Sequence, residues 1–445
     1  MASSKIKFEL PFHITKRTDI PGWKAWLFRG GAIVIAFILT AIVSTILTKG
    51  GMGGFFKEMF VGTMGTANKA LKLLNGWAML LMLGLALVPA FKMKFWNIGA
   101  EGQTLMGALA SVVVIKEWGK VLPEEVLIIL MLLFSLVFGA IWGLIPAIFK
   151  AIWNTNETLF TLMMNYIAIQ MVLFAINIWA PNGSGTIGIL KYGSFSGAFG
   201  MNYIINIVLV TIVTAILFVY IKYSKHGYEI NVVGESVNTA KYIGINVKSV
   251  IIRTMVLSGA LCGLAGWFLV GGSPTPTINS TLVAGRGFTA ILVAWIGQLN
   301  PFIMMGSAFL VIFMQTGAAQ VATTYHIGSS SAYSGIVVGL FFVILIAAEF
   351  LVNYNVVFKV HKHKKVEKAA TPTGEKAGEE PTKEDEKIIT EEQFEEELES
   401  IGTRYFERTI TKSKNFEGND TFTPQKEEVP IEETVEEINE EKVDK

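Results

Sequence analysis

Long apolar runs separated by short polar breaks fill most of the chain. Gly30 to Thr48 is an uncharged run of 19 residues, about the length that a helix needs to cross roughly 30 Å of hydrocarbon. Residues 287–348 hold 62 residues without a charge, counting His326 as neutral, and polar breaks divide them into three spans. The remaining runs lie at 73–91, 97–115, 126–149, 158–180, 203–221 and 254–272. The pattern predicts an all-α polytopic membrane protein with about ten transmembrane helices.

A polar break at 222–253 is the only sizeable internal loop with dense charge. It holds five cations and two carboxylates, Lys222, Lys225, Lys241, Lys248, Arg253, Glu229 and Glu235. An excess of cations marks cytoplasmic loops, so this loop is expected inside. The apolar spacing predicts one short helix from Glu229 to Ile243, closed by Gly244 at its C-cap.

Charge divides the chain into three parts. Residues 1–29 carry several cations and are predicted to be a cytoplasmic segment, and residues 30–358 form the transmembrane domain. Residues 359–445 form the tail, in which the stretch from Val366 onward holds 25 acidic and 11 basic residues. It has few large apolar residues, so a disordered acidic tail is expected. The basic cluster at 361–365 indicates a cytoplasmic exit, which places both termini inside.

Polar residues open the third predicted span, where Asn97, Glu101 and Gln103 stand among glycines. A carboxylate in hydrocarbon costs on the order of 3 kcal/mol, so such groups usually face a cavity or a partner. Irregular backbone at membrane depth is tolerated only where it lines a water-filled path or is buried in protein. The other interpretation is that Glu101 stands near the cytoplasmic interface and caps a helix start.

A counterpart occurs at residues 284–301, a short glycine-punctuated span with Arg286 at one end and Gln298 at the other. The two polar spans lie five spans apart and run in opposite directions, which an inverted repeat of five plus five spans would give. Interrupted spans at corresponding positions of two halves are typical of a transport site. Asn165 belongs to a further polar set in and just before the fifth span, which is either a candidate lining of the substrate path or, as is commoner, a set of interhelical hydrogen bonds.

Other side chains change this picture little. A planar ring could stack on Trp96, Trp153, Phe160 or Trp295 if these faced a cavity, although most aromatics at membrane ends are interfacial anchors. The five histidines stand at terminal or loop positions, where a solvated or interfacial role is expected. The sequence holds no GxxxxGK[ST] loop, HExxH or GxSxG motif, so we expect neither ATP binding by this chain nor a metal site.

Five stretches in order resemble a known family: FWNIGAEGQTLMGALAS (95–111), NETLFTLMMNYIA (156–168), GYEINVVGESVNTAKYIGINV (227–247), LSGALCGLAGWFLV (257–270) and GRGFTAILVAWIGQLNP (285–301). They are similar to permease subunits of bacterial ABC importers, closest to the branch that takes up nucleosides and simple sugars beside a basic-membrane-protein type lipoprotein receptor. The resemblance spans residues 30–355. The acidic tail lies outside it, and ordinary members lack such a tail.

The resemblance implies a plasma-membrane permease that catalyses no covalent chemistry. It implies a second permease subunit, expected to make a heterodimer, separate ATP-binding subunits, the lipoprotein receptor and surrounding lipid, with no cofactor in this chain and no nucleic acid. The loop at 227–247 would match the segment gripped by the ATPases, through Glu229, Val233, Gly234, Glu235, Val237, Ala240, Tyr242 and Gly244. The alternative function is a gradient-driven secondary transporter or channel that works without an ATPase, and a third hypothesis is a membrane scaffold that recruits partners through the tail.

Overall fold

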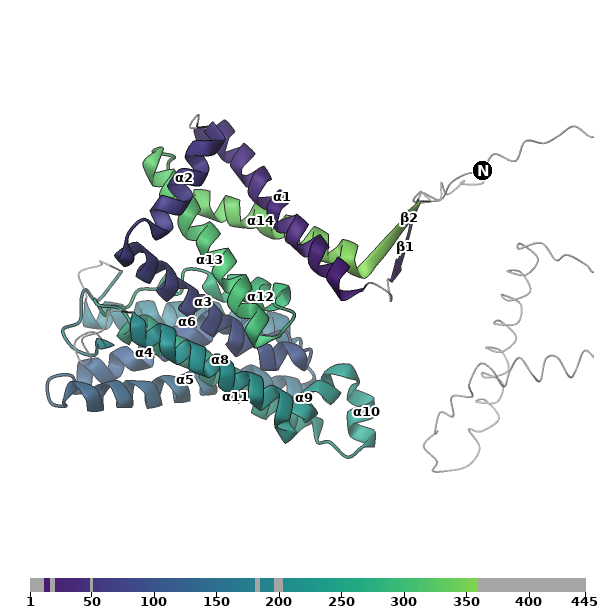
Figure 1. Ribbon diagram of the computed structural model, residues 1–445. Helices are drawn as coiled ribbons and strands as arrows, with labels where there is room; N and C mark the ends of the chain where they lie inside the picture. The colour runs from purple at the N-terminus through teal and green to yellow at the C-terminus, as the bar shows by residue number, and fades with distance from the viewer. Residues whose placement is uncertain (1–11, 17–20, 49–50, 181–184, 196–202, 359–445) are drawn as a thin grey trace, which may run out of the picture. The chain divides into compact units, whose positions relative to one another are not determined.

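The computed structural model describes residues 12–16, 21–48, 51–180, 185–195 and 203–358 (Figure 1). The predicted tail at 359–445 lies outside these residues, and so does most of the segment before Pro21. The disorder of the tail therefore stays a prediction.

Helices make up nearly all of the described chain. In order they are α1 (Gly22–Thr48), α2 (Gly51–Met64), α3 (Ala67–Lys92), α4 (Ala100–Trp118), α5 (Glu124–Trp153), α6 (Glu157–Trp179), α8 (Ile204–Tyr223), α9 (Lys225–Glu235), α10 (Val237–Tyr242), α11 (Val247–Gly271), α12 (Arg286–Ile296), α13 (Pro301–Thr324) and α14 (Ser330–Asn353). Each predicted span falls on one of them, which confirms the helical membrane fold. The glycine-rich α2 was not predicted.

The number of full crossings differs from the ten that the sequence predicts. Eight described helices are long and apolar enough to cross a membrane. The other two predicted spans are α4, which has 19 residues but begins with polar side chains, and α12, which has only 11. At 1.5 Å per residue, α12 is about 16 Å long, roughly half the hydrocarbon thickness. These two helices correspond to the pair that the sequence singles out.

The ends of the helices gather at two opposite ends of the domain. At the end where α9 lies, called here the α9 end, Gly234 packs on the backbone carbonyl of Lys92 and Arg29 pairs with Glu349 at 2.9 Å. Gln298 accepts from Arg29 and lines one cavity with Phe91 and Lys94, so the start of α1 and the ends of α3 and α14 lie together. At the opposite end, Asn206 Nδ2 donates to Asn75 Oδ1 at 2.7 Å. This is the sidedness that an even number of crossings predicts.

Two short strands also join the beginning and the end of the membrane domain. Strand β1 (Phe12–Lys16) pairs antiparallel with β2 (Tyr354–Phe358), and Ile14 is opposite Val356. Because β1 precedes α1 and β2 follows α14, the pairing holds the beginning and the end of the membrane domain side by side.

The centre of the domain is a contact among α4, α5 and α11 in which glycines replace side chains, called here the glycine interface. A Cβ added at Gly263 or Gly259 of α11 would overlap with backbone atoms of α5, and one at Gly107 of α4 would lie 2.5 Å from the Cα of Gly263. Small residues let membrane helices approach closely and gain dispersion contacts that lipid tails cannot match. The interface is therefore tight and intolerant of added volume.

Each half of the predicted repeat contributes one helix that packs on two helices of the other half. Helix α11 packs on α4 and α5, and α3 packs on α12 and α13. Helices α3 and α11 also pack on each other at the centre. If the halves correspond in order, α3 matches α11, α4 matches α12 and α5 matches α13, so this exchange supports the predicted repeat of five plus five spans.

Candidate functional site

Residues 93–99, called here the re-entrant segment, connect α3 to α4. Helix α3 ends at Lys92, and Lys94 adopts a left-handed backbone with φ +58°. The chain then turns back, and Phe95 N donates to Ala90 O at 2.9 Å. Phe95 and Asn97 are buried, so this irregular backbone is covered by protein, as irregular backbone at membrane depth requires.

Asn97 is the centre of a buried amide cluster. Its side chain exchanges two hydrogen bonds with Gln103, at 3.1 and 3.2 Å, and Nδ2 also donates to Ser258 Oγ at 3.1 Å. Ser258 in turn donates to Ala86 O at 2.7 Å. Ser258 is the twelfth of the 25 residues of α11, so the cluster lies about halfway along a membrane-spanning helix.

Glu101 binds the start of α12. Its Oε1 accepts from Gly285 N and its Oε2 from Gly287 N, each at 2.8 Å. Gly285 adopts φ +73°, and a Cβ at Gly287 would lie 2.7 Å from the backbone nitrogen of Glu101, so glycine permits both the turn and the approach. The free N–H groups and positive end of a helix dipole offset the cost of burying a carboxylate. Glu101 thus caps the start of α12, as the alternative interpretation of a helix cap predicts, and it caps a helix other than its own.

Asn165 fixes the re-entrant segment from the side of α6. Its Oδ1 accepts from Gly102 N at 2.8 Å and its Nδ2 donates to Ile98 O at 2.9 Å. One turn earlier, Thr161 Oγ1 accepts from Ile98 N at 3.2 Å. These contacts are the interhelical hydrogen bonding that the sequence suggests, and they orient the backbone that carries Asn97 and Glu101.

Arg286 and Gln298 lie at the two ends of α12. The half-buried guanidinium of Arg286 is attracted by the charge of Glu101, and it forms no hydrogen bond or ion pair within the described part of the chain. Gln298 lies at the α9 end, where its amide oxygen, in the orientation that satisfies both amide atoms, accepts from Arg29. The structure therefore joins Asn97, Glu101, Gln103, Asn165 and the Arg286 end of α12, and keeps Gln298 apart.

The loop at the α9 end holds two helices where the sequence predicts one. Helix α9 ends at Glu235 and α10 begins at Val237, because Ser236 adopts extended backbone and its side chain accepts from Thr239 N at 3.2 Å. The predicted single helix from 229 to 243 is therefore wrong. The C-cap at Gly244 is right: φ is +84°, and Ile245 N donates to Ala240 O at 2.9 Å, as in a Schellman motif.

The predicted ATPase-coupling residues divide into a buried group, called here the seated group, and an exposed group, called here the open group. Glu229, Val233, Gly234 and Ala240 are buried in the domain. Glu235, Val237, Tyr242 and Gly244 are exposed, and the ring of Tyr242 is 93% accessible. A Cβ at Gly234 would overlap with the carbonyl of Lys92. The seated group thus contacts the base of the re-entrant segment, and the open group faces away from the domain.

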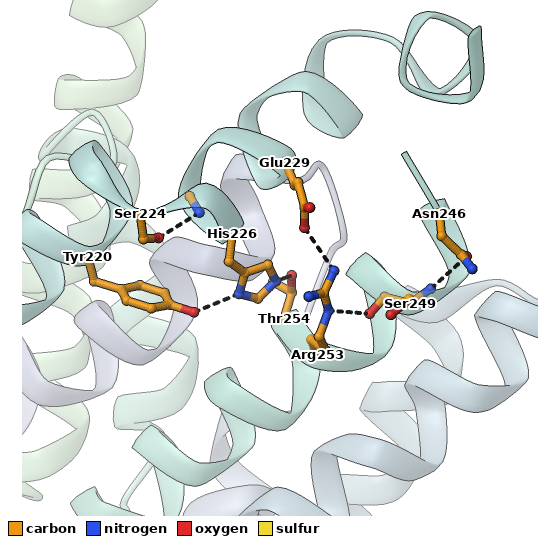
Figure 2. A network of polar contacts seen from close by, with 9 residues as sticks. Tyr220, Ser224, His226, Glu229, Asn246, Ser249, Arg253 and Thr254 are labelled. Atoms are coloured by element: carbon orange, nitrogen blue, oxygen red, sulfur yellow. Dashed lines mark hydrogen bonds and ion pairs between the residues drawn. The ribbon is translucent and has the colours of Figure 1, made fainter. Parts of the chain in front are cut away.

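A polar network ties this loop to α8 and α11 (Figure 2). Tyr220 OH lies 2.7 Å from His226 Nδ1, and His226 Nε2 lies 3.2 Å from Thr254 Oγ1. Arg253 Nη2 pairs with Glu229 at 2.8 Å. Burial lowers the pKa of His226 and the positive charge of Arg253 lowers it further, although Glu229 raises it. Of the two roles expected, solvated or interfacial, the solvated one is therefore wrong for His226, which links α8 to α11.

The sequence pattern did not single out Thr254 and Ser258, which complete these networks. Thr254 and Ser258 lie four residues apart on α11, so they share one helix face: one contacts the loop through His226, and the other contacts Asn97. Polar residues at this spacing inside an apolar run were the available signal. Their partners come from segments far away in sequence, which no local pattern reveals.

Comparison with known proteins identifies the family of the chain. Residues 70–346 match the family described as branched-chain amino acid transport system / permease component. A nucleoside ABC transporter permease protein of Lactococcus lactis is 30% identical over 303 residues, which cover 64% of this chain and 82% of that protein. A glucose ABC transporter permease protein of Haloferax volcanii is 28% identical over 76% of this chain and 92% of that protein. A guanosine ABC transporter permease protein of Bacillus subtilis is 31% identical over 53% of this chain and 69% of that protein.

The family match covers most of the membrane domain, including the re-entrant segment, α12 and the loop at the α9 end. Proteins of this kind are multi-pass membrane proteins that carry out transport, are not enzymes, and work with an ATP-binding subunit. The chain belongs to this family of ABC transporter permease components.

Proposed function

We propose that the chain translocates nucleosides, or simple sugars as the second candidate, with energy from separate ATPase subunits. The observation that carries the proposal is the meeting of the re-entrant segment and the start of α12 beside the middle of α11. Two interrupted elements meet there through Glu101, and Arg286 keeps unused donors beside it. Relatives named for nucleosides and guanosine support the first substrate class.

The seated loop residues would transmit a displacement of α9 to this site. Helix α9 rests on the Lys92 carbonyl through Gly234, and the re-entrant segment begins at the next residue. Thr254 and Ser258 provide a second route along α11. A displacement of α9 by an ATPase subunit would therefore act on the backbone that carries Asn97 and Glu101, without any contact between ATP and this chain.

The open group gives the ATPase its contact surface. Val237, Tyr242 and Ile243 expose 45%, 93% and 51% of their surfaces on α10 and its C-terminus. Exposed apolar side chains gathered on a short helix are typical of a protein contact. In this arrangement the α9 end and both termini are cytoplasmic, and the basic residues of the loop support that orientation.

The remaining partners follow from the same proposal. A second permease, forming a heterodimer, would complete the central path, and a lipoprotein receptor would deliver substrate to the opposite end. Asn97, Glu101, Gln103, Asn165 and Arg286 would then shape the middle of that path, with Gln298 at its inner end.

Two substitutions in the loop test the coupling. Gly234→Ala should abolish ATP-driven uptake in the assembled transporter because the added methyl has no space beside Lys92. Tyr242→Ala should lower uptake by removing the most exposed side chain of α10. Tyr223→Ala is the matched control, since Tyr223 is 70% exposed but lies at the end of α8. Unchanged uptake in both loop variants, at normal protein levels, would refute the coupling role.

A further inference from the structure

A cavity of about 430 Å³ lies at the α9 end between the re-entrant segment and the end of α12. Its lining residues are Phe91, Lys94, Phe95, Trp96, Trp295, Gln298 and Leu299. The volume is within the range of small-molecule sites, and so is the combination of an aromatic lining with few polar groups. A larger cavity of about 720 Å³ lies on the other side of Trp295, but no residue of the re-entrant segment lines it.

Two tryptophans form the aromatic wall. The rings of Trp96 and Trp295 lie 5.4 Å apart at 33°, and their side chains are 42% and 54% exposed. A buried tryptophan usually finds a partner for its indole N–H. Trp77, Trp142 and Trp267 do so, since each donates to a backbone carbonyl. Trp96 and Trp295 donate to no atom of the described residues, so both indoles have a face and a donor available.

The backbone around the cavity is held in an uncommon conformation. Lys94, Gln298 and Leu299 have φ of +58°, +52° and +55°, and each such non-glycine residue costs about 1–3 kcal/mol. Strain of this kind clusters at functional sites. Here it turns two chain segments so that Trp96 and Trp295 meet, although they are far apart in sequence.

Both tryptophans of the cavity belong to segments that also carry residues of the central site. Trp96 precedes Asn97 of the amide cluster, and Trp295 lies on the same helix as Arg286, nine residues further along. At 1.5 Å per residue that separation is about 13 Å. The two indoles therefore lie between the Glu101 level and the α9 end of the domain.

We propose that this cavity is an inner subsite that stacks the base of a nucleoside on Trp96 and Trp295 during release; the proposal rests on the transport function above. A base is a flat, uncharged heterocycle with a few acceptors, which the indole N–H groups and Lys94 can serve. A sugar carries many hydroxyls, and burying hydroxyls without partners is costly. The lining offers too few polar groups for them, so the subsite selects the base and not the ribose.

Protection of an introduced cysteine tests the subsite in the assembled transporter in lipid nanodiscs. The native Cys262 is fully buried, so it adds little background. Leu299→Cys lines the cavity, and Ile152→Cys, at the end of α5, is an exposed control outside it. Guanosine should slow maleimide labelling at position 299 and leave position 152 unaffected, whereas ribose should protect neither.

Uptake provides the second measurement. Trp295→Leu should raise the guanosine concentration for half-maximal uptake at least about threefold, from the loss of an aromatic contact. Trp153→Leu, which is 62% exposed and lies outside the cavity, should not. If guanosine protects neither cysteine, and Trp295→Leu and Trp153→Leu behave alike while wild-type uptake persists, the tryptophans are interfacial anchors and the subsite is wrong. Absence of guanosine uptake in the wild type would instead overturn the proposed substrate.

Discussion

The glycine interface and the α12 side of the domain have opposite kinds of packing. At the interface, backbone meets backbone, and Gly107, Gly259 and Gly263 have no space for a single methyl group. On the α12 side, Arg286 and Trp295 keep polar groups without partners among the described residues, and Trp295 is half exposed. The first region has one arrangement available, whereas the second has contacts still to make.

The difference indicates which part moves. Packed cores shift between discrete arrangements and do not deform continuously, so α4, α5 and α11 should move together. Helix α12 is short and is attached to them through the two hydrogen bonds of Glu101. Its remaining contacts are with α3 and α13, so we expect α12 to move with these two helices relative to α4, α5 and α11.

The largest effect should come from adding one methyl group at the interface. Gly263→Ala should lower stability by about 1–3 kcal/mol, since backbone atoms of α5 cannot move aside easily. Gly339→Ala on α14 is the matched control, because a Cβ there meets nothing within 4 Å and alanine favours helix by up to about 1 kcal/mol. The thermal unfolding midpoint of the purified protein should fall for the first and stay or rise for the second. Equal shifts would contradict the comparison.

The second-largest effect should come from breaking the hydrogen bonds of Glu101, which link the two regions. In Glu101→Gln, only one amide oxygen can accept, and the amide N–H₂ faces a backbone donor. An unsatisfied buried donor costs about 1–3 kcal/mol, so uptake should fall about tenfold while the protein stays folded. Glu125→Gln, at an exposed position in the first turn of α5, should leave uptake unchanged. Wild-type uptake by Glu101→Gln would show that the cap is not part of the mechanism.

A smaller effect is expected from the link between α11 and the amide cluster. Ser258→Ala removes the hydroxyl that bonds Asn97 and Ala86, and an interhelical hydrogen bond in a membrane is worth about 0.6 kcal/mol. Ser111→Ala is the control, since Ser111 bonds only to Gly107 O of its own helix. The unfolding midpoint should drop slightly for Ser258→Ala alone, and a larger drop for Ser111→Ala would reverse the assignment.

The smallest effect concerns pH at the loop. Burial lowers the pKa of His226 below its usual value near 6.5, so the folded loop favours the neutral ring. The unfolded chain then binds the proton more readily, and the stability contributed by this group is complete above pH 6.5 and is lost as pH falls below it. Wild type should therefore lose more stability than His226→Gln between pH 7.5 and 5.5. A steeper loss in the variant would contradict the shift.

Local patterns were sufficient for the apolar spans and insufficient for α2, for the break between α9 and α10, and for the contacts between helices. Uninterrupted apolar runs predicted the spans because hydrocarbon thickness fixes their length. The break at Ser236 was missed because Ile230, Val233, Val237 and Ala240 keep helical spacing across it. Spacing reports which positions are apolar, and it does not report whether a serine leaves the helix to cap the next one.

The candidate site could be predicted only in its composition. Glu101 and Arg286 were identified because charge in an apolar run is costly. Their roles depend on Gly285 and Gly287, which lie more than 180 residues from Glu101. The separation of Gln298 from the cluster has the same origin, since it depends on the length of α12 and on the turn after it.

In the proposed function, ATP hydrolysis by a partner subunit, and no ion gradient, drives transport through this chain. The direct measurement is uptake of labelled guanosine into proteoliposomes that hold the full transporter. ATP is supplied on one chosen side of the membrane, and ionophores are added to collapse the ion gradients. We predict uptake that requires the ATPase subunit and ATP on the α9 side, persists when proton and sodium gradients are collapsed, and is lost in Gly234→Ala. Uptake by this chain without an ATPase, driven by an imposed gradient, would contradict the account and establish the secondary transporter instead.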